Sequence, residues 1–176
     1  MPPLQVGDKF PDGVQFEYAP PLISPPARSH TAVLTTSSTF DASKEFKGKK
    51  VVIVSVPGAF TPGCQANHIP PILANLETFI QKGVDLVAVI GFNDAWVMSA
   101  WGKVNGVKGD SKILFLSDTK SFFSKNHGWD AGMGERNGRW AMIVDKDGTV
   151  TAATFISKTM LTFPRVSGAD AILSKL

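Results

Sequence analysis

Runs of apolar, mostly β-branched residues predict a largely buried sheet. The run VVIVSV, which begins at Val51, indicates a strand covered on both faces, as is typical of a parallel sheet. Lys146-Asp147-Gly148 predicts a hairpin turn between the last two strands. Further strands are expected at 14–18, at 31–40 as its hairpin partner, and at 85–92, 113–117, 140–145 and 149–156.

Apolar residues at helical spacing predict helices between these strands. Asp41 or Ser43 is expected to cap a short helix, and Asp94 a helix that runs to about Val104. The other predicted helices follow Cys64, cover 72–83 after a kink or restart at 70–71, and span 121–127 and a segment from Ser167 or Asp170 to 176. The order β-α-β-α-β-α-β-β-α predicts an α/β protein with a thioredoxin-like fold and an N-terminal extension, with residues 1–176 as a single domain.

Composition excludes several classes of function. The net charge is +3 without a basic run, so a nucleic-acid partner has little support. No apolar run approaches the roughly 20 residues needed to span a bilayer. The single cysteine and the absence of a secretory leader favour a soluble protein in a reducing interior. No metal or other cofactor is expected, because His30, His68 and His127 are scattered and one thiolate cannot build a metal cage.

The single cysteine, Cys64, falls where the strand from Val51 gives way to a helix. Unpaired N–H groups and the helix dipole favour a thiolate in this position, and the thiolate is the form that attacks. Gly63 allows close approach of the backbone, while Thr61 adds a hydroxyl one turn before the sulfur. By position alone, an inert buried cysteine is an equally good interpretation.

The octapeptide Pro57-Gly58-Ala59-Phe60-Thr61-Pro62-Gly63-Cys64 resembles the active-site loop of the peroxiredoxins, and is most similar to their atypical branch. Further matches in the same order extend the resemblance over most of the chain. They are Gly91-Phe92-Asn93-Asp94, Phe115-Leu116-Ser117-Asp118 and Arg139-Trp140-Ala141-Met142.

The resemblance implies a peroxidase in which the thiolate of Cys64 attacks a hydroperoxide and becomes a sulfenic acid. It assigns Thr61 to orienting the thiolate and the peroxide, Pro57 to shielding the pocket, and Arg139 to placing a guanidinium beside both. A thiol of ordinary pKa is already a few per cent ionised at neutral pH, so full ionisation gains only about tenfold to thirtyfold. Fixed donors around the O–O bond must therefore contribute more, and Arg139 and the N–H groups of Gly63 and Cys64 are the candidates.

His68 also matches this branch and follows Cys64 by four residues, so the two share a helix face. A part in binding substrate and a purely structural role both stay open for it. A cysteine hydrolase built from Cys64 and His68 is a weaker alternative, because no orienting carboxylate is evident.

The sulfenic acid must then be reduced by another thiol. The mammalian atypical relatives carry a second cysteine after Leu-Thr near the C-terminus, where this chain has Phe163 after Leu161-Thr162. The resemblance therefore implies a one-cysteine cycle with an external thiol, such as glutathione with glutaredoxin, or thioredoxin. It also implies a homodimer formed through segments next to the active site, with Phe92 and Trp96 as candidate contacts.

The tripeptide Ser174-Lys175-Leu176 matches the peroxisomal address, so the peroxisome is preferred over the cytoplasm. The alternative function is a thioredoxin-like sensor or chaperone module, whose cysteine signals peroxide by its own oxidation without efficient turnover. Multiple turnover with a supplied thiol distinguishes the two.

Overall fold

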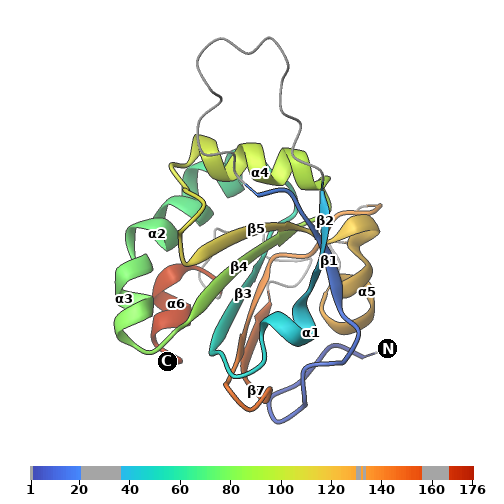
Figure 1. Ribbon diagram of the computed structural model, residues 1–176, viewed down its shortest axis with the longest axis vertical. Helices are drawn as coiled ribbons and strands as arrows, with labels where there is room; N and C mark the ends of the chain where they lie inside the picture. The colour runs from blue at the N-terminus through green and yellow to red at the C-terminus, as the bar shows by residue number, and fades with distance from the viewer. Residues whose placement is uncertain (1, 21–36, 130–131, 133, 156–166) are drawn as a thin grey trace.

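The computed structural model describes residues 2–20, 37–129, 132, 134–155 and 167–176. A seven-stranded mixed sheet in the order β2-β1-β5-β4-β3-β6-β7 lies at its centre (Figure 1). The strands are β1 (Gln15–Tyr18), β2 (Ser38–Asp41), β3 (Val51–Ser55), β4 (Leu86–Gly91), β5 (Ile113–Ser117), β6 (Trp140–Val144) and β7 (Val150–Phe155). The helices are α1 (Ala42–Glu45), π-helix η1 (Cys64–His68), α2 (Ile69–Ala74), α3 (Leu76–Gln81), α4 (Ala95–Val104), 3-10 turn η2 (Thr119–Ser121), α5 (Phe122–His127) and α6 (Ala169–Leu173).

The central strand β3 is buried along its whole length, as its apolar run predicts. It pairs in parallel with β4 and antiparallel with β6, so the sheet is mixed rather than wholly parallel. In the second pairing Ser55 lies opposite Trp140. This register brings the residue before β6 next to the loop that follows β3, which matters for the site described below.

The two faces of the sheet carry separate apolar clusters. Alternate β3 residues point to opposite sides, so Val52 and Val54 belong to one cluster and Val51 and Ile53 to the other. The first cluster packs against η1, α2, α3, α4 and α6, and the second against α1 and α5. Figure 1 shows the same division, with α2, α3 and α6 on one side of the sheet and α1 and α5 on the other. The predicted thioredoxin-like α/β fold is confirmed.

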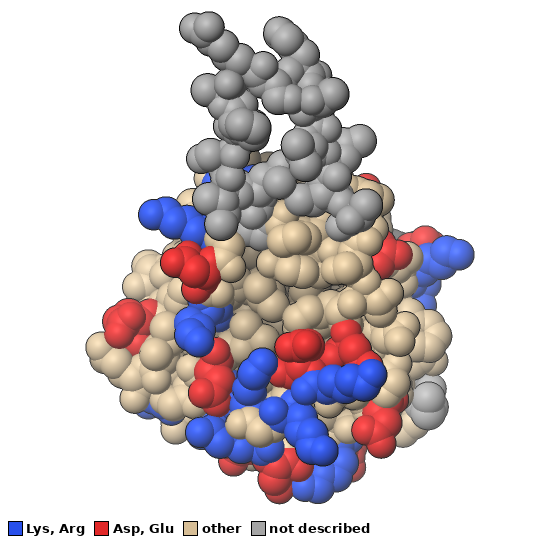
Figure 2. Space-filling view, in the orientation of Figure 1, with Lys and Arg blue, Asp and Glu red and all other residues tan. Residues whose placement is uncertain are grey.

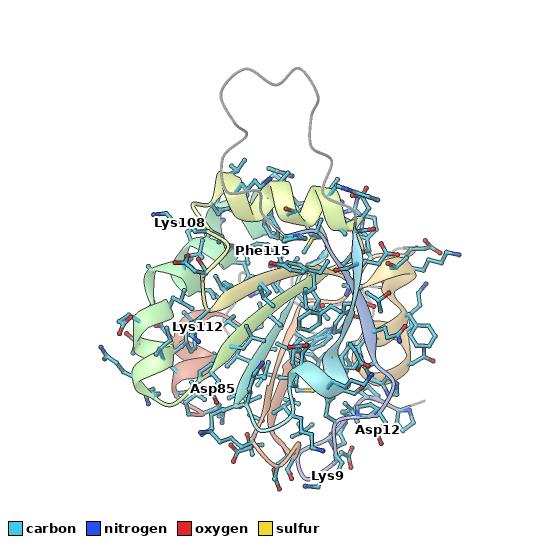
Figure 3. All side chains as sticks on the ribbon, in the orientation of Figure 1. Lys9, Asp12, Asp85, Lys108, Lys112 and Phe115 are labelled. Carbon is cyan, nitrogen blue, oxygen red and sulfur yellow. The ribbon has the colours of Figure 1, made fainter. Side chains whose placement is uncertain are left out.

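The N-terminal segment is fastened to the β6–β7 turn. Lys9 Nζ bonds the Asp147 carboxylate at 2.9 Å and Thr149 Oγ1 at 2.7 Å, and Figure 3 shows Lys9 beside this turn. The segment then enters β1, which pairs antiparallel with β2 as predicted. Positions 31–36 of the predicted partner strand and residue 156 of the last strand lie outside the described residues.

Two predicted helix starts can be compared with the structure at the level of single side chains. Asp41 caps α1 by accepting from Lys44 N at 3.2 Å, and Asp94 caps α4 by accepting from Val97 N at 2.9 Å. The prediction of one helix over 72–83 was wrong, because the chain breaks into α2 and α3 at Asn75. Asn75 departs from helical backbone angles, at φ −101° and ψ 9°, and its side chain also donates to Pro71 O at 2.8 Å.

On the face shown in Figure 2, basic and acidic side chains are interspersed, mostly over the lower half of the view. That face therefore presents no patch of a single sign. Within the described ranges, no helix is both long and apolar enough to cross a membrane.

Candidate active site

Cys64 opens η1 directly after the loop that leaves the central strand. Gly63 before it already has helical backbone angles, at φ −66° and ψ −40°. The loop is pinned on its outer side, since Ala59 N donates to Asn93 Oδ1 at 2.8 Å. Phe60 in the middle of the loop has φ +58°, an unusual conformation for a residue with a side chain. The sharp turn that it makes lets the chain leave β3 and enter a helix within a few residues.

The sulfur of Cys64 is fully buried, and a guanidinium lies beside it. Arg139 Nη2 donates to Cys64 Sγ at 3.4 Å. The two residues meet because Ser55 pairs with Trp140, so Arg139 enters the space beyond the end of β3. A charged donor at this distance stabilises negative charge that develops on an atom next to it during a reaction.

His68 bonds the same guanidinium at the other end of η1. Its Nδ1 lies 2.8 Å from Arg139 Nη1, and its Nε2 lies 2.8 Å from the backbone oxygen of Ser167. A guanidinium can only donate, so Nδ1 is the acceptor and the ring proton sits on Nε2. Burial lowers the pKa of His68 from 6.5 to about 4; the Ser167 carbonyl opposes this shift, and the charge of Arg139 adds to it. The imidazole is therefore neutral at physiological pH.

Cys64 and His68 lie at the two ends of a π-helical turn, not on an α-helix. Ile69 N donates to Cys64 O, five residues back, so the turn is wider than an α-helical one. Four residues still bring both side chains to one guanidinium, as the shared helix face predicts. Both nitrogens of His68 are engaged, by Arg139 and Ser167. No ring nitrogen is left to act as a general base, which argues against the cysteine hydrolase.

Thr61 lies on the loop with its hydroxyl turned toward the backbone. Its Oγ1 donates to Gly58 O at 2.9 Å, so the hydroxyl proton is committed while its lone pairs can accept a further hydrogen bond. Its carbonyl accepts from Gln65 N at 2.8 Å, which ties the loop to η1. An acceptor in this position suits a ligand that carries its own O–H group.

Gly63 and Pro57 have no polar side chain, so they contribute to the site through their size and shape. A Cβ built on Gly63 would lie 3.4 Å from Arg139 Nη2, so a larger side chain would fill the room beside the guanidinium. A Cβ on Gly58 would lie 3.2 Å from the ring of Phe92 and from the methyl group of Thr61. Pro57 is half-buried at the start of the loop.

Three polar side chains around the site were not predicted from the sequence. Gln65 accepts the indole N–H of Trp101 and bonds Asn105 at 3.0 Å, which ties η1 to α4. Asn137 holds the segment that delivers Arg139, and Ser167 Oγ lies 3.4 Å from His68 Nε2. The sequence marks these residues only by position: Gln65 follows Cys64, Asn137 precedes Arg139, and Ser167 precedes the last helix. The sequence does not show that a polar side chain is buried.

No metal centre is evident in the part of the chain that the structure describes, since it holds no group of three or more His, Cys, Asp and Glu side chains able to share an ion. His30 and the segment around Phe163 lie outside the described residues. The described residues bring together one sulfur, one guanidinium, one imidazole, and the hydroxyl and amide groups around them.

Comparison with known proteins fits this arrangement. The sequence pattern of the Redoxin family matches residues 5–173. Peroxiredoxin Pen c 3 of Penicillium citrinum is 45% identical over 173 residues, 98% of this chain and 99% of the relative. A Lipomyces kononenkoae relative whose name includes "peroxisomal peroxiredoxin" is 39% identical, covering 96% of this chain and 99% of the relative. The crystal structure of reduced Prx3 in complex with H2O2 from Vibrio vulnificus has a TM-score of 0.76 at 31% identity, covering 97% of this chain and 94% of that one.

The chain therefore belongs to the Redoxin family and, within it, is a peroxiredoxin, a thiol-dependent peroxidase. With one cysteine in 176 residues, it is of the one-cysteine type in the atypical branch.

Proposed function

We propose that the protein reduces hydrogen peroxide and organic hydroperoxides through Cys64, and that an external thiol completes the cycle. The observation that carries this proposal is the Arg139 guanidinium, 3.4 Å from the sulfur and fixed by His68 on its other side. A donor already in place costs no reorganisation when charge develops during the reaction.

In the first step the Cys64 thiolate attacks the terminal oxygen of ROOH. The S–O bond forms as the O–O bond breaks, and the RO⁻ that leaves takes up a proton to give an alcohol or water. Arg139 stabilises the charge on both sulfur and departing oxygen, while Thr61 Oγ1 accepts the peroxide O–H. Pro57 and Gly63 shape the space for the peroxide, and His68 supports substrate binding through the guanidinium that it holds.

In the second step an external thiol R′SH attacks Cys64–SOH, releasing water and leaving a mixed disulfide. A second thiol then frees Cys64 and forms R′SSR′. Glutathione with glutaredoxin, or thioredoxin, supplies these thiols. Because the reduced sulfur has no exposed surface, η1 must open for this step. A π-helix of one turn is a weak element and suits such opening.

The experiment is stopped-flow peroxide reduction, followed by steady-state turnover with glutathione and glutaredoxin or with thioredoxin as the sole donor. Wild type should turn over many times, and Cys64→Ser should not react. One oxidation per chain, without recycling by either donor, would favour the alternative of a sensor or chaperone module.

We further infer a homodimer formed beside the active site. Phe60 on the active-site loop and Trp96 on α4 are 48% and 49% exposed, unusual for large aromatic side chains. Phe92, just before α4, is half-buried beneath the guanidinium of Arg136. Sedimentation of wild type and Trp96→Glu tests this: a monomer in wild type would contradict the inference.

Localisation to the peroxisome is the final proposal, with the cytoplasm as the alternative. The name of the Lipomyces relative supports it, and so does the tripeptide Ser174-Lys175-Leu176. Ser174 and Lys175 are exposed, whereas Leu176 is half-buried against the core. Imaging an N-terminally tagged chain with and without the tripeptide gives the test, because only the intact chain should co-localise with peroxisomes.

A further inference from the structure

The loop before Arg139 is anchored in the interior by Asn137, whose side chain is fully buried. Asn137 Nδ2 donates to Asp118 Oδ2 at 2.8 Å and to Ser124 Oγ at 2.7 Å. Its Oδ1 accepts from Ser121 Oγ at 2.8 Å. Both amide protons and the amide oxygen thus have partners, so the side chain is held in one orientation.

The partners of Asn137 are themselves fixed. Asp118 N donates to Gly91 O at 2.8 Å, which ties the residue to the end of β4. The Asp118 carboxylate accepts from the backbone N–H groups of Phe123 and Ser124 at 2.8 and 3.0 Å, at the start of α5. The network therefore connects the Arg139 loop to both the sheet and a helix.

Ser121 joins this network at the cost of an unfavourable backbone. It and Lys120 have φ values of +53° and +56°, in the left-handed region that residues with side chains avoid. This conformation brings the Ser121 hydroxyl to Asn137 Oδ1 and to the backbone oxygen of Glu135, which share its one proton. The turn at Lys120 and Ser121 thus holds the loop before Arg139 at two residues, Glu135 and Asn137.

The residue between Asn137 and Arg139 is held as well. Gly138 N donates to Trp129 O at 2.8 Å, and its carbonyl accepts from the buried Ser55 hydroxyl at 2.9 Å. The backbone of Gly138, directly before Arg139, is therefore held at both its N–H and its carbonyl. The placement of the Arg139 guanidinium depends on the placement of this loop.

We propose that Asn137 is a positioning residue for peroxide reduction, acting through Arg139; this rests on the proposed function of the site. Asn137 does not touch the sulfur and is not a catalytic residue. Its effect comes from geometry, because a misplacement of about 1 Å can cost on the order of a hundredfold in rate. A buried amide that only stabilised the fold would not depend on which residue stands at 139.

A double-mutant cycle separates these two roles. Asn137→Leu keeps the approximate volume and removes every hydrogen bond of the side chain, and it is made in wild type and in Arg139→Lys. The second-order rate constant for hydrogen peroxide is measured by stopped flow on the reduced proteins. Ser121→Ala is the milder second variant, and Ser99→Ala, a buried serine on α4 outside the network, is the matched control.

We expect Asn137→Leu to lower the rate constant by about tenfold or more in wild type, and by less than about twofold in Arg139→Lys. Ser121→Ala should show the same dependence on Arg139 with a smaller loss, and Ser99→Ala should match wild type. Equal losses in both backgrounds, or wild-type rates in both network variants, would overturn the proposal. If Asn137→Leu does not fold, the Ser121→Ala cycle decides alone.

Failure of the proposed function gives a different result. In that case wild type itself does not consume peroxide, and no cycle can be built. If wild type reacts rapidly and the losses are additive, the peroxidase assignment stands and only the positioning role of Asn137 is wrong.

Discussion

Arg139 and His68 share a 2.8 Å hydrogen bond in which the imidazole can only be the acceptor. The other guanidinium nitrogen, Nη2, faces Cys64 Sγ. One planar group thus bonds a neutral ring and a sulfur at once, and its fork is oriented before any peroxide arrives. An ammonium carries the same charge but has no such fork.

Arg139→Lys should therefore be a severe change although the charge is kept. We expect the second-order rate constant for hydrogen peroxide to fall by about a hundredfold or more, the usual effect of removing one oriented donor. Stopped-flow kinetics of the reduced protein measures it. Arg136→Lys, at an exposed arginine of the same loop, should stay close to wild type. An unchanged rate in Arg139→Lys would remove the electrostatic role while leaving the family assignment intact.

The stability of the fold should fall in mild acid because of His68. Its pKa is 6.5 unfolded and about 4 folded, so between these values the unfolded chain binds the proton and the folded chain does not. The contribution of His68 to the free energy of unfolding should therefore be constant above about pH 6.5, fall as the pH drops to about 4, and lose about 3 kcal/mol in all.

Urea unfolding at a series of pH values checks this, with His68→Gln as the matched variant. Gln does not titrate, so the difference between the two curves isolates the imidazole from other acid-sensitive groups. Parallel curves between pH 4 and 6.5 would show that His68 is not the group responsible.

Trp101 should report on the state of Cys64. Its indole N–H donates to Gln65, the residue after the cysteine, so opening of η1 breaks this bond. We expect peroxide addition to change tryptophan fluorescence in wild type, and most of that change to be lost in Trp101→Phe. Trp96→Phe, at the exposed tryptophan of the same helix, should keep the signal.

Gly128→Ala should destabilise the protein. A Cβ at this position would lie 2.7 Å from Cζ2 of the fully buried Trp140, too close without movement of the ring or the backbone. Overpacking of this kind costs about 1–3 kcal/mol. Lys125→Ala, an exposed change on α5, should stay within about 0.5 kcal/mol of wild type. Denaturant unfolding of the two variants provides the comparison.

The centre of the sheet could be predicted from the sequence because β3 and β4 are buried apolar runs, and β5 was found with its bounds at Ile113 and Ser117. The cap at Asp94 was predictable because an aspartate stands directly before a segment with apolar residues at helical spacing. The break at Asn75 was missed because the apolar spacing continues across it, while the backbone of this one residue leaves helical angles. Patterns of hydrophobicity do not show such a local change of the backbone.

The site was predicted in part. Local sequence placed Cys64 at the start of a helix after β3 but left an inert buried cysteine equally possible. The roles of Cys64 and Arg139 were assigned through resemblance, and the contact between them spans 75 positions. The tautomer of His68 and the burial of Asn137 depend on partners that meet only in the folded chain. Neither residue type nor spacing indicates them.

The pairing of β3 with β6 also has a consequence during synthesis. Cys64 is translated long before β6, so a nascent chain on the ribosome carries the cysteine without Arg139 beside it. Under the proposed mechanism, rapid reaction with peroxide begins only once β6 has paired with β3, and a chain that terminates before Arg139 has no guanidinium beside its cysteine.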